Sequence, residues 1–419
     1  MAKARAECAR DASAVGDVSG KGACGKMDSS RRAMTVLVLN AGSSSLKFRL
    51  SRFKNAGSRV EEIGRGVIER IGRAGGEAVE VCDHGGAVRR VVERVAGIPN
   101  SQPIEAVGHR VVHGGSRFVE PTLIDDDVMV AIAALEDLAP LHNGPSLAVI
   151  RACREALGAA VPMIAVFDTA FHATLPEHAS RYAIPYEMAE RHGIRRFGFH
   201  GTSYRSVVAR YGEVAGRPVG GSALVVFHLG NGCSVAAIRD GVSVDTSMGF
   251  TPLEGLVMGT RAGDLDPALV GYLARKEGVP TVEVEGWLNE RSGLLGLSGH
   301  SADMRDLLTR EQHDRRARLA VDVFCYRARK YLGAYLAALG GAHAVVFTGG
   351  IGEHQPEVRA RICAGMEWCG LTLDERRNAE VVGAEGCISA GTSAIRAFVI
   401  PTDEEAIIAR DTMETLRGQ

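Results

Sequence analysis

The sequence has no apolar run that approaches the roughly 20 residues needed to cross a bilayer, and its first residues lack the apolar stretch of a secretory signal. Its nine cysteines form no CxxC pair and no Cys/His spacing suited to zinc. The formal net charge is only −1, which gives no general attraction to nucleic acid or to an anionic membrane. We therefore expect a cytoplasmic protein with neither kind of partner, whose anion chemistry is confined to a cleft.

Length and composition are those of a globular protein with two domains. The chain has 419 residues, of which 46% are hydrophobic and 24% are charged. Residues 1–33 show neither helical nor strand periodicity, so they are predicted to be a disordered tail, with Met27 and Met34 as alternative starts. In this tail Gly20–Met27 matches a P-loop except at Met27, which replaces the Ser or Thr that must ligate magnesium, and we reject that motif.

A pattern of strand, glycine-rich turn and strand opens the ordered sequence. Thr35–Leu39 is a continuous apolar run typical of a buried strand, and the turn Asn40–Ser45 follows it. In Leu46–Leu50 apolar residues alternate with polar ones, so one face enters a core while Lys47 projects from the other.

The same pattern recurs later in the chain. A strand over residues 223–227 leads into the turn His228–Ser234 and a second strand, which ends at an Asp240-Gly241 hairpin turn. A third strand, Ala344–Thr348, leads into the glycine-rich run Gly349–Glu353. The sequence therefore predicts an internal duplication and one ligand that several glycine turns hold from different sides.

Strands alternate with amphipathic helices between these units, which is an α/β pattern. Residues 161–167 are predicted to form a strand that ends before Asp168, and residues 318–339 a helix that Gly340 closes. Near the C-terminus a strand leads into a helix for which Thr402 and Glu405 have capping-box spacing. We expect this last helix to pack on the first domain.

The two hairpins have the chemistry that a nucleoside triphosphate requires. Glycine and serine turns supply backbone N–H donors with little side-chain bulk, while a cation and oxygen ligands for magnesium complete such a site. Asn40, Lys47 and His228 lie at corresponding edges of the two hairpins. This repetition favours a phosphate site over two unrelated tight turns.

Together with further motifs, these residues resemble the acetate kinase family, which includes propionate kinases. The resemblance covers residues 34–415, and the motifs that carry it follow the family's order: Asn40–Phe48, Gly108–Gly115, Phe167–His172, Gly198–Ser203, His228–Gly232, Met258–Pro267, Asp303–Arg305, Gly349–Glu353 and Pro401–Glu405. It implies the fold of the sugar kinase, Hsp70 and actin superfamily, in which two duplicated α/β domains of ribonuclease H type close on a nucleotide. It also implies a homodimer, a first domain over residues 34–182 completed by residues 404–419, and a nucleotide-binding domain over residues 183–403.

The resemblance also implies roles for individual residues. Magnesium, or alternatively manganese, would lie near Asn40 and Glu404. The nucleotide would contact Lys47, His228, Leu229, Gly230, Asn231, Gly232, Asp303, Met304, Arg305, Gly350, Ile351, Gly352, Glu353 and His354. The catalytic residues would be Asp168, His200 and Arg261. The substrate carboxylate would bind Arg110, and its alkyl group would contact Val112, Leu141, Phe199 and Pro252.

Physical chemistry supports most of these roles independently. Phosphoryl transfer spreads charge over three equatorial oxygens, so catalysis depends on positioning and electrostatic stabilisation, for which arginine forks and a histidine are suited. A carboxylate substrate is already ionised at neutral pH and needs no general base. We therefore expect Asp168 to orient Arg110, Arg261 or a magnesium-bound water. His142 and His172 are interpreted as structural hydrogen-bonding residues.

The function that follows is reversible transfer of the γ-phosphoryl group of ATP to acetate, giving acetyl phosphate and ADP. The alternatives are a propionate or other short-chain acyl kinase on the same fold and, from another class, an actin-like or Hsp70-like ATPase without an acyl site. Two departures from the family pattern bear on specificity. The run Leu141–Ser146 contains Pro145, which affects the acyl pocket, and His354 stands where the family usually has Asn, which leaves GTP and pyrophosphate open as donors.

Overall fold

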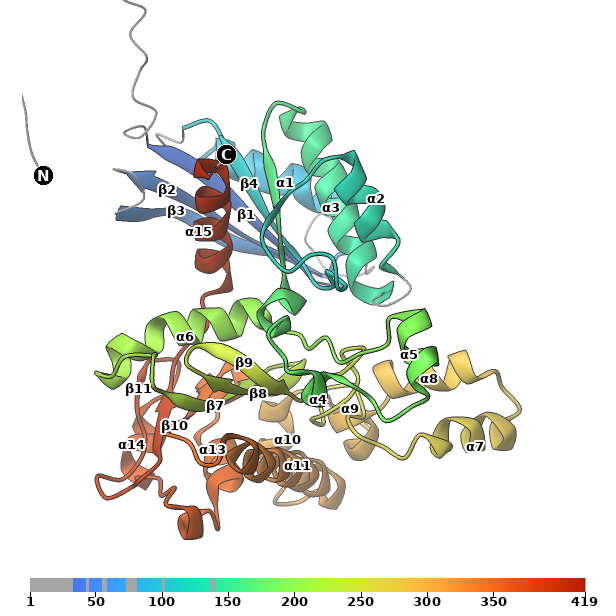
Figure 1. Cartoon of the computed structure of the whole chain (residues 1–419), viewed down its shortest axis with the longest axis vertical. Coiled ribbons are helices and arrows are strands. Elements are labelled where there is room, and N and C mark those ends of the chain that lie inside the picture. Colours follow the sequence, from blue (N-terminus) through green and yellow to red (C-terminus); the bar gives the residue numbers. More distant parts are fainter. Residues whose placement is uncertain are drawn as a thin grey trace, which may run out of the picture.

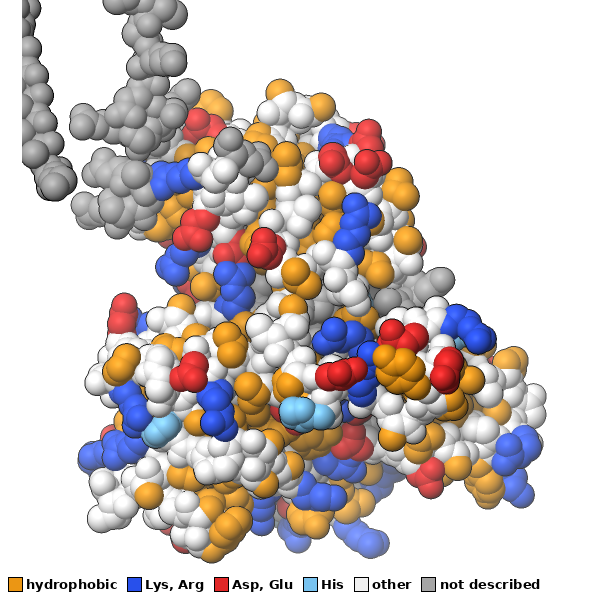
Figure 2. Space-filling view, in the orientation of Figure 1, with side chains coloured by type: hydrophobic (Ala, Val, Ile, Leu, Met, Phe, Trp, Pro, Cys, Tyr) orange, Lys and Arg blue, Asp and Glu red, His pale blue; other side chains and the backbone are white. Residues whose placement is uncertain are grey.

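The computed structural model describes residues 33–42, 45–54, 59–72, 81–99, 102–136 and 140–418, except for the side chains of Arg59 and of residues 140–142 (Figure 1). The segment with the P-loop-like run, and the predicted tail up to residue 32, lie outside these residues. Figure 2 shows basic and acidic side chains on the same face of the molecule, in keeping with the net charge of −1. Among the described residues, no helix is long and apolar enough to span a membrane.

The first sheet belongs to the upper domain of Figure 1 and has the strand order β3-β2-β1-β4-β6-β5. Its strands are β1 (Met34–Ala41), β2 (Ser45–Lys54), β3 (Arg59–Glu69), β4 (Ala106–Val111), β5 (Thr122–Leu123) and β6 (Met163–Phe167). The pairs β1/β4 and β4/β6 are parallel, and the other three pairs are antiparallel. The sheet is therefore mixed, with a parallel centre.

Helices cover both faces of this sheet because β1 alternates its side chains between them. Leu37 and Leu39 pack in one core with α1 (His84–Ala96), α2 (Asp126–Ala133) and α3 (Pro140–Leu157). Val36 and Val38 pack on the other face against Ile408 of α15 (Glu404–Arg417). The C-terminal helix thus crosses from the second domain onto the first sheet, as its dark red ribbon shows in Figure 1.

The second sheet repeats the first. Its strands are β7 (Ala223–Leu229), β8 (Cys233–Arg239), β9 (Val242–Thr246), β10 (Ala344–Thr348), β11 (Gly386–Cys387) and β12 (Arg396–Val399). Read from β9, the order is β9-β8-β7-β10-β12-β11, and each pair has the direction of its counterpart in the first sheet. The predicted internal duplication and α/β fold are therefore confirmed.

The remaining helices cover the second sheet, connect its strands or lie between the two sheets in the chain. One face packs against α11 (Arg315–Leu339) and the other against α6 (Gly201–Ala215). The other helical segments are η4 (Asp168–His172), α4 (Glu177–Ser180), α5 (Tyr186–His192), α7 (Ala268–Glu277), α8 (Thr281–Glu290), α9 (Gly293–Ser298), α10 (Met304–Arg310), α12 (Gly349–His354), α13 (Pro356–Cys363), η5 (Glu367–Cys369) and α14 (Glu375–Glu380).

The helix ends show where local sequence signals succeed and where one fails. Gly340 ends α11 with a left-handed φ of 66°, as predicted, but the helix starts at Arg315 because Asp314 caps it. The expected capping box of the last helix is wrong. Asp403, not Thr402, is the N-cap residue of α15 and accepts a hydrogen bond from Ala406 N at 3.1 Å.

A fully buried arginine fastens the segments beside the second sheet. Within the described part of the chain, Arg359 of α13 donates five hydrogen bonds, one to the Asn378 side chain and four to the carbonyls of Gly352, Glu353, Asn378 and Val381. Because these acceptors are neutral, burial lowers the pKa of Arg359 to about 10. Two of the carbonyls belong to α12, so Arg359 fixes the helix that begins with the predicted nucleotide turn.

We expect Arg359→Met to lower the free energy of unfolding of the second domain by about 3 kcal/mol or more, because five acceptors lose their donor, three of them in fully buried hydrogen bonds. Urea unfolding followed by circular dichroism measures this change. Arg376→Met is the matched control, since Arg376 makes an exposed ion pair with Glu380 and its loss changes stability by about 0.5 kcal/mol or less. Equal shifts in the two variants would contradict the role assigned to Arg359.

Candidate active site

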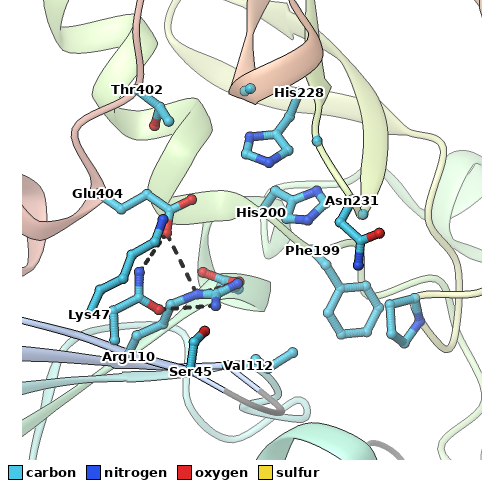
Figure 3. A pocket seen from close by; sticks show the side chains of 18 of the residues that line it. Ser45, Lys47, Arg110, Val112, Phe199, His200, His228, Asn231, Thr402 and Glu404 are labelled. Carbon is cyan, nitrogen blue, oxygen red and sulfur yellow. Dashed lines mark hydrogen bonds and ion pairs between the residues drawn. The ribbon is translucent and has the colours of Figure 1, made fainter. Parts of the chain in front are cut away.

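A cavity of about 660 Å³ lies where the turns of the two sheets face each other (Figure 3). It is bounded by the β1–β2 turn, the β7–β8 turn, the start of α12 and the segment before α15. In Figure 3, Lys47, Arg110 and Glu404 lie on one side and His200, His228 and Asn231 on the other. The lining residues are Asn40, Ala41, Gly42, Ser45, Lys47, Arg110, Val112, Asp168, Phe199, His200, His228, Gly230, Asn231, Gly232, Pro252, Arg261, Gly349, Gly350, Glu353, Thr402, Glu404 and Glu405.

Arg110 and Asp168 form an ion pair at one wall. Arg110 is the next-to-last residue of β4, and Asp168 directly follows β6. The parallel register of these two strands brings the two side chains together. Nε and Nη2 of Arg110 donate to Oδ2 of Asp168 at 3.0 and 2.5 Å. Thr202 donates to the other oxygen, Oδ1, at 2.8 Å. Burial alone would lower the pKa of Arg110, but the charges of Asp168 and Glu404 outweigh it and raise that pKa.

Two glutamates at the start of α15 share one amide. Asn40 Nδ2 donates to Glu404 at 3.0 Å and to Glu405 at 2.9 Å, while Asn40 Oδ1 accepts from Arg110 at 3.2 Å. Burial raises the pKa of Glu404, Arg110 opposes that shift, and the neighbouring Asp168 and Glu405 add to it. A cation beside these carboxylates would favour their ionised form.

The donor set at this point fits magnesium bound together with a nucleotide. In the described part of the chain, no group of three or more His, Cys, Asp or Glu side chains could hold a metal alone. Magnesium is usually held by one or two carboxylates, with phosphate oxygens and waters as its other ligands. Glu404 and Glu405 supply two carboxylates beside Lys47, which fits that pattern.

Two stacked imidazoles face these groups. The rings of His200 and His228 lie 4.1 Å apart between centroids, inclined by 25°. Burial, then the neighbouring His228 and Arg110, holds the pKa of His200 well below 6.5. Burial and then Arg110 lower the pKa of His228 to about 4. Both side chains are therefore neutral at pH 7. His200 has a left-handed φ of 61°, a strained conformation for a residue with a side chain.

Arg261 reaches the same place from the loop between β9 and α7. Its Nη1 donates to the carbonyl of Pro252 at 2.8 Å, and burial lowers its pKa. A Cβ on Gly232 would lie 3.3 Å from Nε2 of His200 and 3.7 Å from Nη2 of Arg261. Gly232 thus leaves room for both groups beside the glycine turn, where a larger residue would crowd them.

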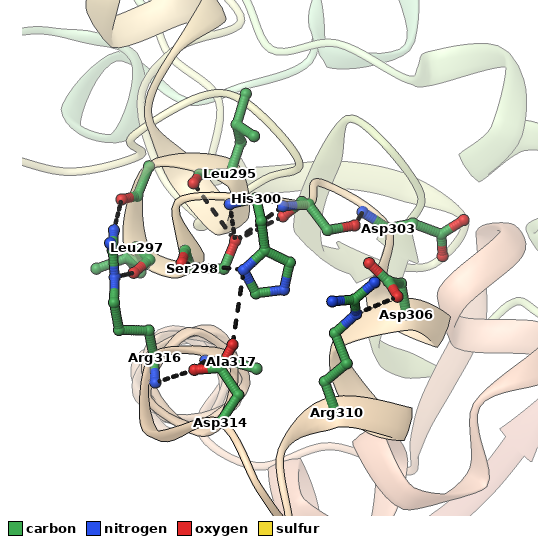
Figure 4. A network of polar contacts seen from close by, with 12 residues as sticks. Leu295, Leu297, Ser298, His300, Asp303, Asp306, Arg310, Asp314, Arg316 and Ala317 are labelled. Carbon is green, nitrogen blue, oxygen red and sulfur yellow. Dashed lines mark hydrogen bonds and ion pairs between the residues drawn. The ribbon is translucent and has the colours of Figure 1, made fainter.

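A second cavity of about 490 Å³ adjoins the first and shares Gly230, Asn231 and Gly350 with it. It is also lined by Asp303, Met304, Arg305, Ile351 and His354. The loop before α10 is held by polar contacts, in which Ser298 Oγ accepts from His300 N and the His300 ring lies 3.6 Å from Asp314 (Figure 4). Of the predicted nucleotide residues, those at the start of α10 therefore share one cavity with Gly350, Ile351 and His354 of α12, while Glu353 lines the main cavity.

The sequence model of the acetokinase family matches residues 35–410. This chain belongs to the acetokinase family. An acetate kinase of Solibacter usitatus is 51% identical to it over 415 residues, which cover 92% of this chain and 99% of the relative. The crystal structure of Porphyromonas gingivalis acetate kinase matches with a TM-score of 0.82 and 40% identity, over 91% of this chain and 100% of that one.

A propionate kinase has an equally similar structure. The crystal structure of the enzyme from Francisella tularensis matches with a TM-score of 0.83 and 37% identity, over 91% of this chain and 99% of that one. Overall similarity to solved acetokinase structures therefore does not separate acetate from propionate as the substrate. The preference between acetate and propionate therefore depends on the residues that line the cavity.

Three of the four expected acyl-pocket residues line the main cavity, namely Val112, Phe199 and Pro252. Leu141 lies in the first turn of α3, and its side chain is outside the described part of the structure. Two expected nucleotide residues line neither cavity. The Leu229 side chain is fully buried in the core, and Gly352 packs against Phe347. Leu229 can offer a nucleotide only its backbone.

Several polar residues at the site were not predicted from the sequence to belong to it. Ser45, Thr402 and Glu405 line the cavity, while Thr202 holds Asp168. Two hydroxyls contact the stacked imidazoles: Ser234 lies 2.8 Å from His200 Nδ1 and Ser203 2.8 Å from His228 Nδ1. The run Gly198–Ser203 contained Thr202 and Ser203, so only the contacts made by its hydroxyls were missed.

His172 is buried beside the site, with hydrogen bonds at both ring nitrogens, as its structural interpretation predicts. Burial lowers its pKa from 6.5 to about 4. Between these values the unfolded chain binds a proton that the folded chain does not, so His172 stabilises the fold fully above pH 6.5 and progressively less as the pH falls to about 4.

We expect His172→Gln to make stability less dependent on pH by about 1.4 kcal/mol per pH unit in that window. Urea unfolding of both proteins at about pH 7.5 and about pH 5 measures the two slopes. The variant should be less stable than the parent at the higher pH, and the difference should shrink at the lower one. Identical slopes would mean that folded His172 takes up its proton as readily as the unfolded chain.

Proposed function

We propose that this chain transfers the γ-phosphoryl group of ATP to acetate, giving acetyl phosphate and ADP, in a reversible reaction. One observation carries the proposal. Arg110, His200 and Arg261 come from three separate segments and line one cavity together with the glycine turn of β7 and β8. An ATPase needs the glycine turn and a metal. It does not need a buried arginine such as Arg110 beside apolar side chains, because it binds no carboxylate substrate.

The phosphates of ATP lie along the β7–β8 turn in this proposal. Backbone N–H groups at Asn231 and Gly232 donate to phosphate oxygens, since that of Gly230 bonds the Gly232 carbonyl, and Lys47 adds a positive charge from the opposite hairpin. The nucleoside occupies the adjoining cavity between α10 and α12. Mg²⁺, or Mn²⁺ in its place, would be held by Glu404 and Glu405 and would neutralise charge on the phosphates. Asn40, which was also expected near the metal, would orient both carboxylates through its amide.

Acetate binds with its carboxylate on Arg110 and its methyl group against Val112, Phe199 and Pro252. The guanidinium has five N–H donors, of which two bond Asp168 and one bonds Asn40, so two remain for the substrate. These two lie on the terminal nitrogens, which is the fork geometry that recognises a carboxylate. The apolar residues then set the length of the acyl chain.

Transfer of the phosphoryl group is stabilised by Arg261 and His200. The transition state spreads negative charge over the equatorial oxygens, and fixed donors in a water-poor site stabilise it most. His200 is neutral, so it donates a hydrogen bond but carries no positive charge that would offset the charge of a neighbouring carboxylate. Asp168 acts by orienting Arg110, because acetate is already ionised and Oδ2 of Asp168 is occupied by two guanidinium N–H groups.

The proposal extends to a homodimer in the cytoplasm, as the resemblance implies. Leu319 and Tyr326 lie two turns apart on α11 and are 48% and 61% exposed. Two large apolar side chains on one face of a long helix are in keeping with a surface that a second copy of the chain covers.

The hydroxylamine capture assay, run with acetate, propionate and butyrate, tests the activity and its substrate. We expect acetate to be the best substrate, with kcat/KM about tenfold or more lower for propionate, because one methylene is worth about 1–3 kcal/mol in such a pocket. Butyrate should be poorer still. A higher value for propionate makes the chain a propionate kinase, and ADP formation without any hydroxamate makes it an ATPase. ATP, GTP and pyrophosphate as donors test the effect of His354.

Asp168→Asn tests the orienting role. The amide is neutral, and it keeps both Arg110 contacts only by turning its NH₂ group toward Thr202, so Arg110 loses the charge that fixes its position. We expect kcat/KM for acetate to fall about 100-fold, with a raised KM and an unchanged shape of the pH–rate profile. Thr202→Val is the matched control and should cost about tenfold or less. Loss of the acidic limb with an unchanged KM would instead identify Asp168 as a general base.

A further inference from the structure

Three buried histidines at or beside the site share one arrangement. In each, Nδ1 lies 2.8 Å from a serine hydroxyl: His200 with Ser234, His228 with Ser203, and His172 with Ser243. A serine hydroxyl donates or accepts, so distance alone does not say which nitrogen carries the proton. The other partners of each hydroxyl decide it.

His172 is the case in which the direction is certain. Its Nε2 lies 3.0 Å from the carbonyl oxygen of Phe199, and a carbonyl can only accept. Neutral His172 therefore carries its proton on Nε2, and its Nδ1 accepts from Ser243.

A chain of two hydroxyls fixes the proton of His200 in the same way. Tyr204 is fully buried, and within the described part of the chain its hydroxyl has Ser234 Oγ as its hydrogen-bond partner, at 2.5 Å. Since a buried O–H needs an acceptor, Tyr204 donates to Ser234. Ser234 then has its own hydrogen left to donate to Nδ1 of His200, so His200 carries its proton on Nε2.

Ser203 does the same for His228. It is fully buried, and among the residues described the partner of its hydroxyl is Nδ1 of His228. Donation to that nitrogen satisfies the serine hydrogen and leaves the proton of neutral His228 on Nε2.

Both Nε2 atoms point at the glycine turn. A Cβ on Gly230 would lie 3.6 Å from Nε2 of His228, and a Cβ on Gly232 would lie 3.3 Å from Nε2 of His200. With the protons on these atoms, the stacked rings present two N–H donors to whatever occupies the turn. With the protons on Nδ1, they would present two lone pairs and repel phosphate oxygens.

We propose that Ser203, Ser234 and Tyr204 are positioning residues that hold His228 and His200 as neutral Nε2–H donors toward the phosphates of the nucleotide. The proposal rests on the proposed kinase function for the identity of the phosphate, but not for the position of the protons. Ser234 and Tyr204 act through His200, and Ser203 acts through His228.

The test reads the tautomers directly by ¹⁵N NMR of the full-length, nucleotide-free protein labelled at histidine, at about pH 7.5. Histidine-to-glutamine variants assign the signals, and His172 is the internal reference for an Nε2–H ring. We expect His200 and His228 to show the same pattern as His172. An Nδ1–H pattern at His200 or His228 would overturn the proposal, whatever the enzyme's activity.

Ser234→Ala supplies the functional arm. Without the serine donor, we expect a second tautomer to appear at His200 and kcat to fall about tenfold or more, with KM for ATP and acetate within about twofold of the parent. Ser234→Thr retains a hydroxyl and should restore both readings. Ser243→Ala is the matched control. The Phe199 carbonyl still holds the His172 proton on Nε2, so both tautomer and kcat should stay unchanged.

Tyr204→Phe tests the same chain of hydroxyls with less risk to folding, because it removes one oxygen atom and leaves the packed ring in place. It should broaden or shift the His200 signal and lower kcat less than Ser234→Ala does. Unchanged tautomers and unchanged kcat in both Ser234→Ala and Tyr204→Phe would refute the positioning role. If the wild-type rings are Nε2–H but no acid yields a hydroxamate, the proposed function fails while the tautomer assignment stands.

Discussion

The buried ion pair of Arg110 and Asp168 is the interaction on which the geometry of the cleft depends. A charge removed from water is costly unless a partner and further hydrogen bonds satisfy it. Asn40 of β1 supplies such a bond to the guanidinium, and Thr202 of α6 supplies one to the carboxylate. Because α6 packs on the second sheet and β1 belongs to the first, the pair also ties the two domains together at the cleft.

The duplicated topology explains why two chemically different walls face each other. Each domain begins its sheet with an antiparallel hairpin of two strands. The second residue pair from the turn is Asn40 with Lys47 in the first hairpin and His228 with Ser234 in the second. Equivalent positions therefore point toward the same space from opposite sides. One copy carries an amide and a cation beside the carboxylates of α15, and the other carries neutral imidazoles, so a polyphosphate between them meets charge on one side and N–H donors on the other.

Much of this architecture was predictable from the sequence because the signals are local. Alternation of apolar and polar residues identified Lys47, glycine clusters identified the turns, and Gly340 marked the end of α11. Alternation applied to β7 would also have assigned His228 to the cleft and Leu229 to the core. What was not predictable rests on distant partners. The spacing of Glu405 predicts a capping box, whereas its side chain contacts Asn40, which lies 365 positions away. No local pattern distinguishes the Ser234 hydroxyl from any other buried serine.

The balance of charge in the cavity shows what a nucleotide must bring with it. With the histidines neutral, the lining has three cationic side chains, Lys47, Arg110 and Arg261, and four carboxylates, Asp168, Glu353, Glu404 and Glu405, a sum of −1. Such a cavity does not attract a bare triphosphate by net charge. In the proposed function, binding comes from directed donors, which are the glycine-turn N–H groups and the two imidazoles, and from a divalent cation that enters with the phosphates. The carboxylates that would oppose the triphosphate are then those that would favour the cation, so the proposed function implies a cleft that discriminates against a nucleotide without its metal.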